Sequence, residues 1–387
     1  MDKNALNILE MVEMIMNKTK EAYHNMSTFN LMVLGKTGVG KSTLINSVFL
    51  QKVADVGVGM PVTSEIKEHH IEGYPLVLFD TPGLELDGEN AFNQLYSSIQ
   101  QTITDRVRTG DPNRLIHCIW YCVATPSHRF EKTEMDFIIR LSQNSPNKIP
   151  VILVLTQSYS KAESKALKEE IEKQNVNIPI VPLLAEDFAL DEATVVRAYG
   201  LDALLSTVEE VVPEAVKSTL YAVQKVDIEI KKEKANGIIG LYAAAAATIG
   251  AVPIPFSDAF LLVPDQIAML ANITATFGLP VNKGVLTSVI SATIGTAGAT
   301  ILGKTVVANL LKLIPGAGKI VGGVISASVA AALTCALGET YTLILAKIVN
   351  GEVPQDVLQS EQGIQMISEI FKEKLKVKRN KNGVPIE

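Results

Sequence analysis

The stretch that decides the fold spans residues 31–49 and reads LMVLGKTGVGKSTLINSVF. An apolar, strand-like segment leads into a loop with three glycines, and a helical pattern follows. Gly35, Gly40, Lys41 and Ser42 satisfy the pattern G-x-x-x-x-G-K-[ST] and stand between a strand and a helix, as a phosphate-binding loop requires. Backbone N–H groups of such a loop, together with the helix N-terminus, hold phosphate oxygens. We therefore predict a nucleotide-binding loop.

The positions of this loop have different expected roles. Lys41 is expected to reach the β- and γ-phosphates, which makes it a catalytic residue as well as a binding residue. The Ser42 hydroxyl is expected to ligate Mg²⁺. Contacts to the nucleotide are expected along the whole loop: Gly35, Lys36, Thr37, Gly38, Val39, Gly40, Lys41, Ser42 and Thr43.

A second motif, LVLFDTPGLE at residues 76–85, follows at a suitable distance. Asp80 ends an apolar strand, which is where a carboxylate holds the Mg²⁺ shell, and Gly83 offers a backbone N–H to the γ-phosphate. Together the two motifs resemble the translation-factor class of P-loop GTPases, whose third motif reads D-x-x-G. That resemblance implies GTP or GDP and Mg²⁺ as ligands. It also implies that Thr63, in GVGMPVTSEI, is the metal-ligating and catalytic threonine of the first switch.

Two departures from that pattern bear on mechanism. Leu84 stands where Ras-like proteins carry a glutamine that orients the attacking water. The chain is similar in this respect to Era-like and septin-like GTPases, so we expect slow intrinsic hydrolysis and a missing group supplied by a partner or by a homodimer of the nucleotide-binding domains. Gly38 stands where potassium-activated relatives carry asparagine, so we expect no potassium site.

The base-recognition motif is degenerate. The resemblance implies N/T-K-x-D after the strand VILVLT, where this chain has Thr156, Gln157, Ser158 and Tyr159. Tyr159 therefore replaces the aspartate that accepts from guanine. We expect Thr156, Gln157 and Ser158 to lie at the base, with Ala185 as the matched residue of the family's S-A-K loop. Guanine is favoured, and an ATPase of similar fold stays open.

The pattern around these motifs predicts an α/β fold. Apolar strand-like runs alternate with helical patterns, which argues for a mostly parallel sheet with helices on both faces. The residues between the second and third strands are too few for a crossover, so these two strands must be antiparallel. We expect strands at 29–34, 65–71, 75–80, 116–123, 151–156 and 178–184, and helices at 41–49, 89–103, 132–141, 161–174 and 203–211.

We divide the chain into an amphipathic helix at 1–28, a Ras-like domain at 29–215, an all-α hydrophobic domain at 216–350, and an amphipathic helix with a basic tail at 351–387. Only eight charged side chains occur between residues 236 and 350. The segment VPIPFSDAFLLVPDQIAMLANITATFG resembles a bacterial helical domain of unknown function found behind Era-like GTPases. The whole chain is also distantly similar to immunity-related GTPases.

The charge-free runs allow two interpretations. Each is near the roughly 20 residues that cross a bilayer, and small residues suit helix packing there. Prolines and aspartates interrupt the first runs, so a compact helical domain lying against a membrane is the alternative. We expect membrane association, with integral insertion left open.

Composition excludes several other classes of protein. The net charge of -6 gives no general attraction to nucleic acid, so we predict no such partner. The N-terminal residues show no secretory signal, and Cys118 and Cys122 are too far apart along one strand to form a disulfide. We therefore expect a cytoplasmic protein at the cytoplasmic face of a membrane. The expected activity is slow GTP hydrolysis, and a nucleotide-regulated scaffold with negligible turnover is the alternative.

Overall fold

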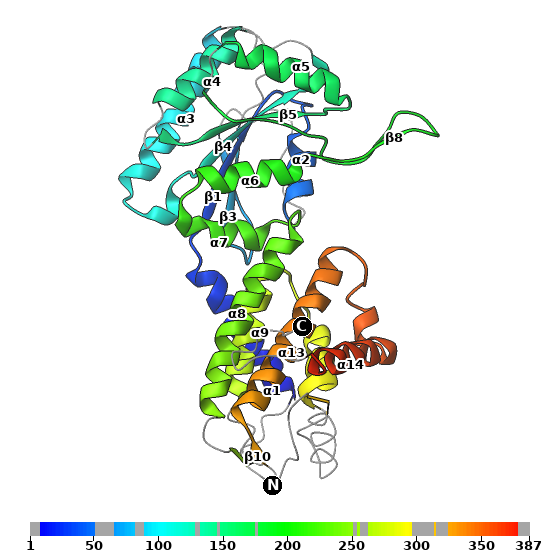
Figure 1. The fold of residues 1–387 in the computed structure, drawn as a ribbon. Coiled ribbons are helices and arrows are strands. Elements are labelled where there is room, and N and C mark those ends of the chain that lie inside the picture. Colours follow the sequence, from blue (N-terminus) through cyan, green and yellow to red (C-terminus); the bar gives the residue numbers. More distant parts are fainter. Residues whose placement is uncertain are drawn as a thin grey trace. The chain divides into compact units, whose positions relative to one another are not determined.

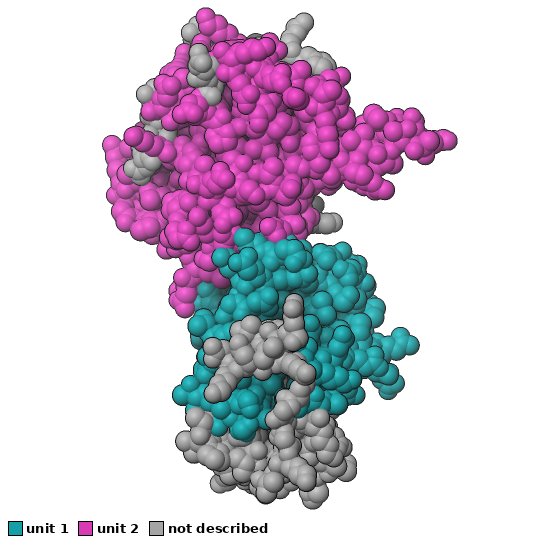
Figure 2. Space-filling view, in the orientation of Figure 1, with its two compact units in different colours: residues 1–23, 228–387 teal, residues 24–227 magenta. Residues whose placement is uncertain are grey.

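The computed structural model describes residues 8–50, 66–81, 89–127, 132–144, 148–174, 177–250, 254–255, 262–295, 313–314 and 324–377. The chain divides into two compact units. One unit contains residues 24–227, and the other combines residues 1–23 with residues 228–387 (Figure 2).

A six-stranded sheet forms the centre of the 24–227 unit (Figure 1). Its strand order is β2-β3-β1-β4-β5-β6, and every neighbouring pair is parallel except β2 with β3. The predicted mostly parallel sheet and its antiparallel hairpin are therefore confirmed. The strands are β1 (Phe29–Leu34), β2 (Lys67–His70), β3 (Leu76–Asp80), β4 (Cys118–Ala124), β5 (Val151–Thr156) and β6 (Ile180–Pro182).

Helices cover both faces of the sheet. Alternate residues of β4 show why: Trp120 belongs to one apolar core and Tyr121 to the other, and both are fully buried. The Trp120 core includes residues of α2 (Lys41–Val48), α6 (Leu201–Val211) and α7 (Glu214–Val223). The Tyr121 core includes residues of α3 (Glu89–Arg108), α4 (Lys132–Asn144) and α5 (Lys161–Glu172). A parallel sheet that is buried on both faces explains the almost continuous apolar strands.

The sheet unit extends to Asp227, beyond residue 215, where we placed the end of the Ras-like domain. Val216, Leu220 and Val223 of α7 lie in the same core as Trp120, so α7 packs as part of this unit. The backbone N–H of Leu50 also donates to the Val223 carbonyl, at 2.9 Å.

The second unit is helical. Its elements are α1 (Ile8–Asn25), α8 (Ile228–Ile249), α9 (Val263–Phe277), α10 (Lys283–Ile290), α13 (Ala327–Val349) and α14 (Glu361–Leu375), with a short pairing of β9 (Ile254–Pro255) and β10 (Val324–Ile325). Helix α13 lies against α8 so closely that a Cβ added to Gly338 would come 2.5 Å from Ile239 Cγ1. Within the part of the chain that the structure describes, α13 is the one helix long and apolar enough to cross a membrane, and 83% of its apolar window is buried inside the protein.

A buried lysine forms a hydrogen bond to the C-terminal end of another helix of this unit. Lys231 of α8 is fully buried, and its Nζ donates to the Phe277 carbonyl at 2.7 Å. That carbonyl belongs to the last turn of α9, where a cation offsets the helix dipole. Burial lowers the pKa of the Lys231 ammonium well below its ordinary value.

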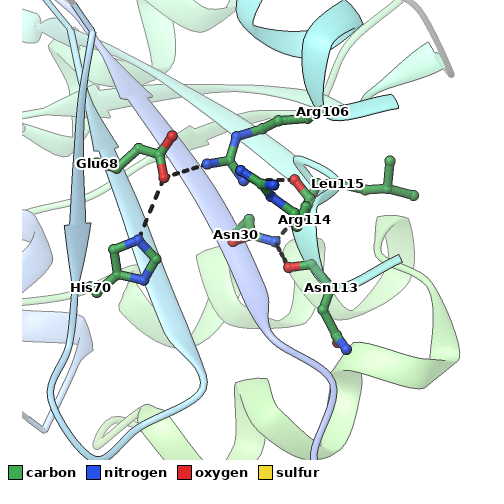
Figure 3. Close-up of polar contacts among 7 residues, drawn as sticks. All are labelled: Asn30, Glu68, His70, Arg106, Asn113, Arg114 and Leu115. Carbon is green, nitrogen blue, oxygen red and sulfur yellow. Dashed lines mark hydrogen bonds and ion pairs between the residues drawn. The ribbon is translucent and has the colours of Figure 1, made fainter. Parts of the chain in front are cut away.

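A polar cluster joins the edge strand β2, helix α3 and residues near the start of β1 (Figure 3). Arg106 of α3 forms an ion pair with Glu68 of the edge strand β2, and its guanidinium stacks 4.4 Å from the Phe79 ring centroid. Arg106 Nη1 also donates to the Arg114 carbonyl at 2.8 Å. The imidazole of His70 lies 3.5 Å from the Glu68 carboxylate and forms an ion pair with it when protonated. Partial burial alone would raise the pKa of the Glu68 carboxyl. The hydrogen bond and charge of Arg106, together with His70, outweigh burial, so the pKa of Glu68 is below its ordinary value.

Asn30, the second residue of β1, belongs to the same polar cluster. Its Nδ2 donates to the carbonyls of Asn113 and Leu115, both at 2.8 Å (Figure 3). Its backbone N–H donates to Nδ1 of His117 at 3.1 Å, and burial lowers the pKa of His117 to about 4. His117 is therefore neutral at neutral pH.

Candidate nucleotide-binding site

The predicted phosphate loop lies between β1 and α2. Its three glycines all have positive φ: 141° at Gly35, 79° at Gly38 and 90° at Gly40. Only glycine adopts such angles freely, and at Gly35 an added Cβ would also come 2.5 Å from the Cys122 carbonyl oxygen. The local sequence thus creates a loop whose backbone N–H groups can turn toward a phosphate at the start of α2.

Lys41 and Ser42 occupy the first positions of α2. Lys41 Nζ donates to the carbonyls of Gly35 and Lys36, at 2.7 and 3.0 Å. The ammonium therefore lies across the loop, held by two of the loop's own carbonyls. Ser42 is partly exposed one residue further on. The expected roles of both residues stay predictions.

Asp80 lies beside this loop because β3 pairs with β1. The register places Asp80 opposite Val33, just before the loop begins. Asp80 is buried, and the hydroxyl of the next residue, Thr81, donates to the Val33 carbonyl at 3.4 Å. The Asp80 carboxylate and the Ser42 hydroxyl are hard oxygen donors of the kind that Mg²⁺ prefers. The residues that are present, Asp80 and Ser42, therefore fit Mg²⁺ shared with phosphate oxygens.

Thr63, Gly83 and Leu84 lie outside the described residues. In the described ranges, no group of three or more His, Cys, Asp or Glu side chains could hold a metal ion by itself. Two protein oxygens and the phosphates are the usual donor set for Mg²⁺ in such loops.

The loop after β5 is bonded directly to the phosphate loop. Thr156 is buried, and its Oγ1 donates to the Val39 carbonyl at 2.6 Å. Gln157 has a positive φ of 51°, and its Nε2 donates to the Gly38 carbonyl at 2.8 Å. Two residues that we expected at the base therefore hold the phosphate loop in shape. The sequence carried no signal for these bonds, since the partners are far apart in the chain.

Ser158 and Tyr159 continue this loop. Ser158 is buried, and its Oγ lies 2.8 Å from the Thr125 hydroxyl and donates to the Leu155 carbonyl at 2.9 Å. Its side chain thus connects the loop after β5 to Thr125 and to the end of β5. The partly exposed Tyr159 ring packs against the ring of Phe188, with centroids 4.2 Å apart.

Phe188 belongs to a small hairpin of β7 (Phe188–Ala189) and β8 (Val195–Val196) that follows β6. The hairpin extends away from the sheet (Figure 1) and forms a projecting arm on the unit surface (Figure 2). The predicted site residue Ala185 is half-buried and leads into the arm. Sequence reasoning missed the hairpin, although alternating polar and apolar residues around the Asp191 turn were a usable signal.

A buried carboxylate also reaches the phosphate loop. Glu134 of α4 lies 3.4 Å from Lys36 Nζ and accepts from the Tyr121 hydroxyl at 3.2 Å. Its side chain is 4% exposed, so the Lys36 charge compensates a carboxylate that has lost most of its water. No pattern in the sequence indicated this pair.

The part of the chain that contains this loop resembles known proteins in sequence. Residues 25–204 match the septin family model. Human septin-9 is 30% identical over 176 residues, which cover 40% of this chain and 29% of septin-9. Rat neuronal-specific septin-3 is 30% identical over 171 residues, 38% of this chain and 46% of that protein. The chain therefore matches less than half the length of either relative.

Solved structures of GTP-binding proteins also align with this chain. Toc33 from Arabidopsis thaliana in complex with Mg²⁺ and GMPPNP is 18% identical, with a TM-score of 0.32 over 55% of this chain and 92% of that one. A probable GTP-binding protein, engB, is 18% identical, with a TM-score of 0.32 over 47% of this chain and 97% of that one. The sheet order, the phosphate loop and the septin match lead to one conclusion: the chain contains an α/β P-loop GTPase domain similar in sequence to that of septins, followed by a helical region that this match does not reach.

Proposed function

We propose that this protein binds GTP and GDP with Mg²⁺ and hydrolyses GTP slowly. The single observation that carries the proposal is the position of Lys41, whose ammonium lies across the glycine loop next to the strand pair that ends at Asp80. When bound, Mg²⁺ would neutralise charge on the β- and γ-phosphates. Ser42, Thr63 and Asp80 would hold it, Lys41 would bind the β- and γ-phosphates, and the backbone N–H of Gly83 would donate to the γ-phosphate.

Slow hydrolysis is proposed because Leu84 replaces the expected glutamine. A leucine side chain has no hydrogen-bonding group to orient water. We propose that a second copy of this chain supplies the missing group when two nucleotide-binding domains meet. A group of this kind supplied in trans accelerates hydrolysis in Ras by about 10⁵-fold.

The helical unit is proposed to connect nucleotide state with a membrane surface at the cytoplasmic face. Support comes from the sparsely charged sequence between residues 236 and 350. Most of the apolar window of α13 is buried within the protein, which favours contact with the membrane surface over crossing by this helix. The likeness of residues 216–350 to the bacterial helical domain behind Era-like GTPases belongs to the same proposal.

The binding test compares Lys41→Ala with Lys165→Ala. Lys165 is an exposed lysine of α5 whose described partner is Glu169, so it controls for loss of a positive charge. Lys41→Ala should abolish GTP binding in equilibrium titrations, and Lys165→Ala should leave it unchanged. Equal GTP affinity of the two variants would show that Lys41 does not bind the nucleotide and would contradict the proposed site.

Turnover measured at increasing protein concentration tests the self-association. Specific activity should rise with concentration and rise further on liposomes. Flat specific activity across a hundredfold range, with and without lipid, would leave either an external activator or the scaffold function. Competition between GTP and ATP decides the remaining alternative of an ATPase, which the absence of an aspartate at position 159 keeps open.

A further inference from the structure

The loop after β5 and the hairpin after β6 lie on a defined side of the proposed nucleotide site. In the strand order β3-β1-β4-β5-β6, Asp80 ends the strand on one side of the phosphate loop. Strands β5 and β6 lie on the other side of β1, so the loops that follow them lie on the side of the phosphate loop away from Asp80. Asp80 would hold Mg²⁺, which would supply positive charge to the β- and γ-phosphates, so the γ-phosphate end of a bound nucleotide would lie on the Asp80 side. The nucleoside end therefore points toward the residues that follow β5 and β6.

Hydrogen bonds connect the loop after β5 to the phosphate loop and to the end of β6. Gln157 Nε2 donates to the Gly38 carbonyl, so the loop after β5 is directly adjacent to the phosphate loop. The N–H of Ser158 donates to the Leu183 carbonyl at 3.2 Å, which joins the same loop to the end of β6. Tyr159 follows at once, in a turn closed by its own N–H on the Gln157 carbonyl at 2.8 Å.

Two aromatic rings are presented where the nucleoside would lie. The Tyr159 and Phe188 rings pack at 4.2 Å between centroids with an angle of 41° between their planes. Tyr159 is partly exposed, and Phe188 remains 39% exposed although it is a large apolar side chain. An exposed aromatic pair beside a phosphate loop is suited to stacking with a base.

The nearby carboxylates of the hairpin have other partners. Asp187 pairs with Arg197 and accepts from the backbone N–H of Ala198 at 2.8 Å, and these bonds lower its pKa. Asp191 accepts from the N–H groups of Ala193 and Thr194 in the hairpin turn. Glu186 is exposed and lies near Lys225: burial lowers the pKa of that lysine, and the Glu186 charge offsets part of this shift.

We propose that Tyr159 and Phe188 form an aromatic wall on which the purine base stacks, so that the site recognises the face of the base and not the exocyclic amine of guanine. The inference rests on the proposed nucleotide binding and specifies how the base is held. Stacking on an aromatic ring tolerates different bases because each base has a π face. A site that pairs with a polar edge instead rejects an analogue that lacks the group by about 10⁴-fold or more.

The experiment measures affinities of GTP, ITP and inorganic tripolyphosphate by competition against labelled GTP. ITP lacks the exocyclic amine, and tripolyphosphate lacks the whole nucleoside, base and ribose. For the wild type, GTP and ITP should bind within about tenfold of each other. Tripolyphosphate should bind more weakly than GTP by the factor of about 5 to 150 that loss of one stacked base predicts, and loss of any ribose contact adds to that factor.

Tyr159→Leu should weaken GTP and ITP by a common factor and leave tripolyphosphate unchanged. Tyr159→Phe should retain wild-type affinity because the proposal uses the ring and not the hydroxyl. Phe188→Leu, at an exposed position, provides a second variant that does not disturb the core. Leu190→Ala, in the turn of the same hairpin and 57% exposed, is the matched control and should change nothing.

Three results would overturn the inference. GTP could outcompete ITP by several hundredfold, with Glu186→Gln abolishing the difference, which would identify edge recognition by that carboxylate. Tyr159→Leu could weaken tripolyphosphate as much as GTP, which would make Tyr159 a support of the phosphate loop. Equal binding of GTP and tripolyphosphate would leave nucleotide binding intact and remove any base contact. If the wild type bound neither compound, the proposed function itself would fail.

Discussion

Replacing Thr156 by valine should show how strongly the loop after β5 supports the phosphate loop. The Thr156 hydroxyl donates to the Val39 carbonyl at 2.6 Å and lies 3.1 Å from the Val123 carbonyl. Thr156 is 2% exposed, so water cannot replace the donor without rearrangement. Valine has nearly the same shape as threonine and creates no cavity. The effect therefore reports the hydrogen bond itself.

The expected magnitude follows from this geometry. Loss of one buried hydrogen bond, with a carbonyl left unsatisfied, costs about 1–3 kcal/mol of unfolding free energy. If about 1.4 kcal/mol of this cost falls on the phosphate loop, nucleotide affinity should decrease about tenfold. Thr156→Ser retains the hydroxyl and should recover most of both quantities.

The assay is urea unfolding followed by tryptophan fluorescence. The chain has a single tryptophan, Trp120, which is fully buried in the sheet and so reports the sheet unit alone. The matched control is Thr102→Val, which removes an exposed hydrogen bond to the Ser98 carbonyl at 2.9 Å. A surface change of this kind should alter stability by less than about 0.5 kcal/mol. If Thr156→Val destabilised the unit no more than Thr102→Val, the loop after β5 would not support the phosphate loop.

Two further predictions concern pH. The pKa of His117 is about 4 in the folded protein, because of burial, against 6.5 for the free side chain, so the unfolded chain binds the proton first as pH falls. Stability of the sheet unit should therefore decrease from about pH 6.5 to about pH 4, by about 3 kcal/mol from this group, and His117→Gln should flatten the curve of Trp120-detected unfolding against pH. An unchanged slope in the variant would assign the pH dependence to other groups. Burial lowers the pKa of Lys231 below 10.5, so the unfolded state binds more protons and stability of the helical unit should rise as pH increases toward about 10. Lys231→Met should lose that rise in urea unfolding followed by circular dichroism, and an equal rise in both proteins would contradict the assignment.

Some features follow from the sequence because neighbouring residues cause them. The glycine positions of the phosphate loop are local requirements for positive φ, and the loop therefore lies where the pattern predicted. The antiparallel pairing of β2 with β3 follows from a connection too short for a crossover. The position of Asp80 at the end of an apolar strand follows from its own motif, whereas the pairing of β3 with β1 brings it beside the loop.

Other features depend on which strands become neighbours. Gln157 bonds to Gly38 because β5 ends beside β4, which ends beside β1. The Tyr159 ring meets Phe188 because the connection after β6 forms a hairpin. Each partner is ordinary in its own sequence window, so no local pattern indicated the contact.

The sequence by itself determined the phosphate loop, the alternation of sheet strands with helices and the low charge of the helical region, because each depends on spacing and composition. Only the tertiary structure decided the partners of buried polar groups. Glu134 reaches Lys36, and Lys231 reaches the Phe277 carbonyl, across long stretches of chain. A buried polar group must find a partner wherever packing brings one, and packing is a property of the whole fold.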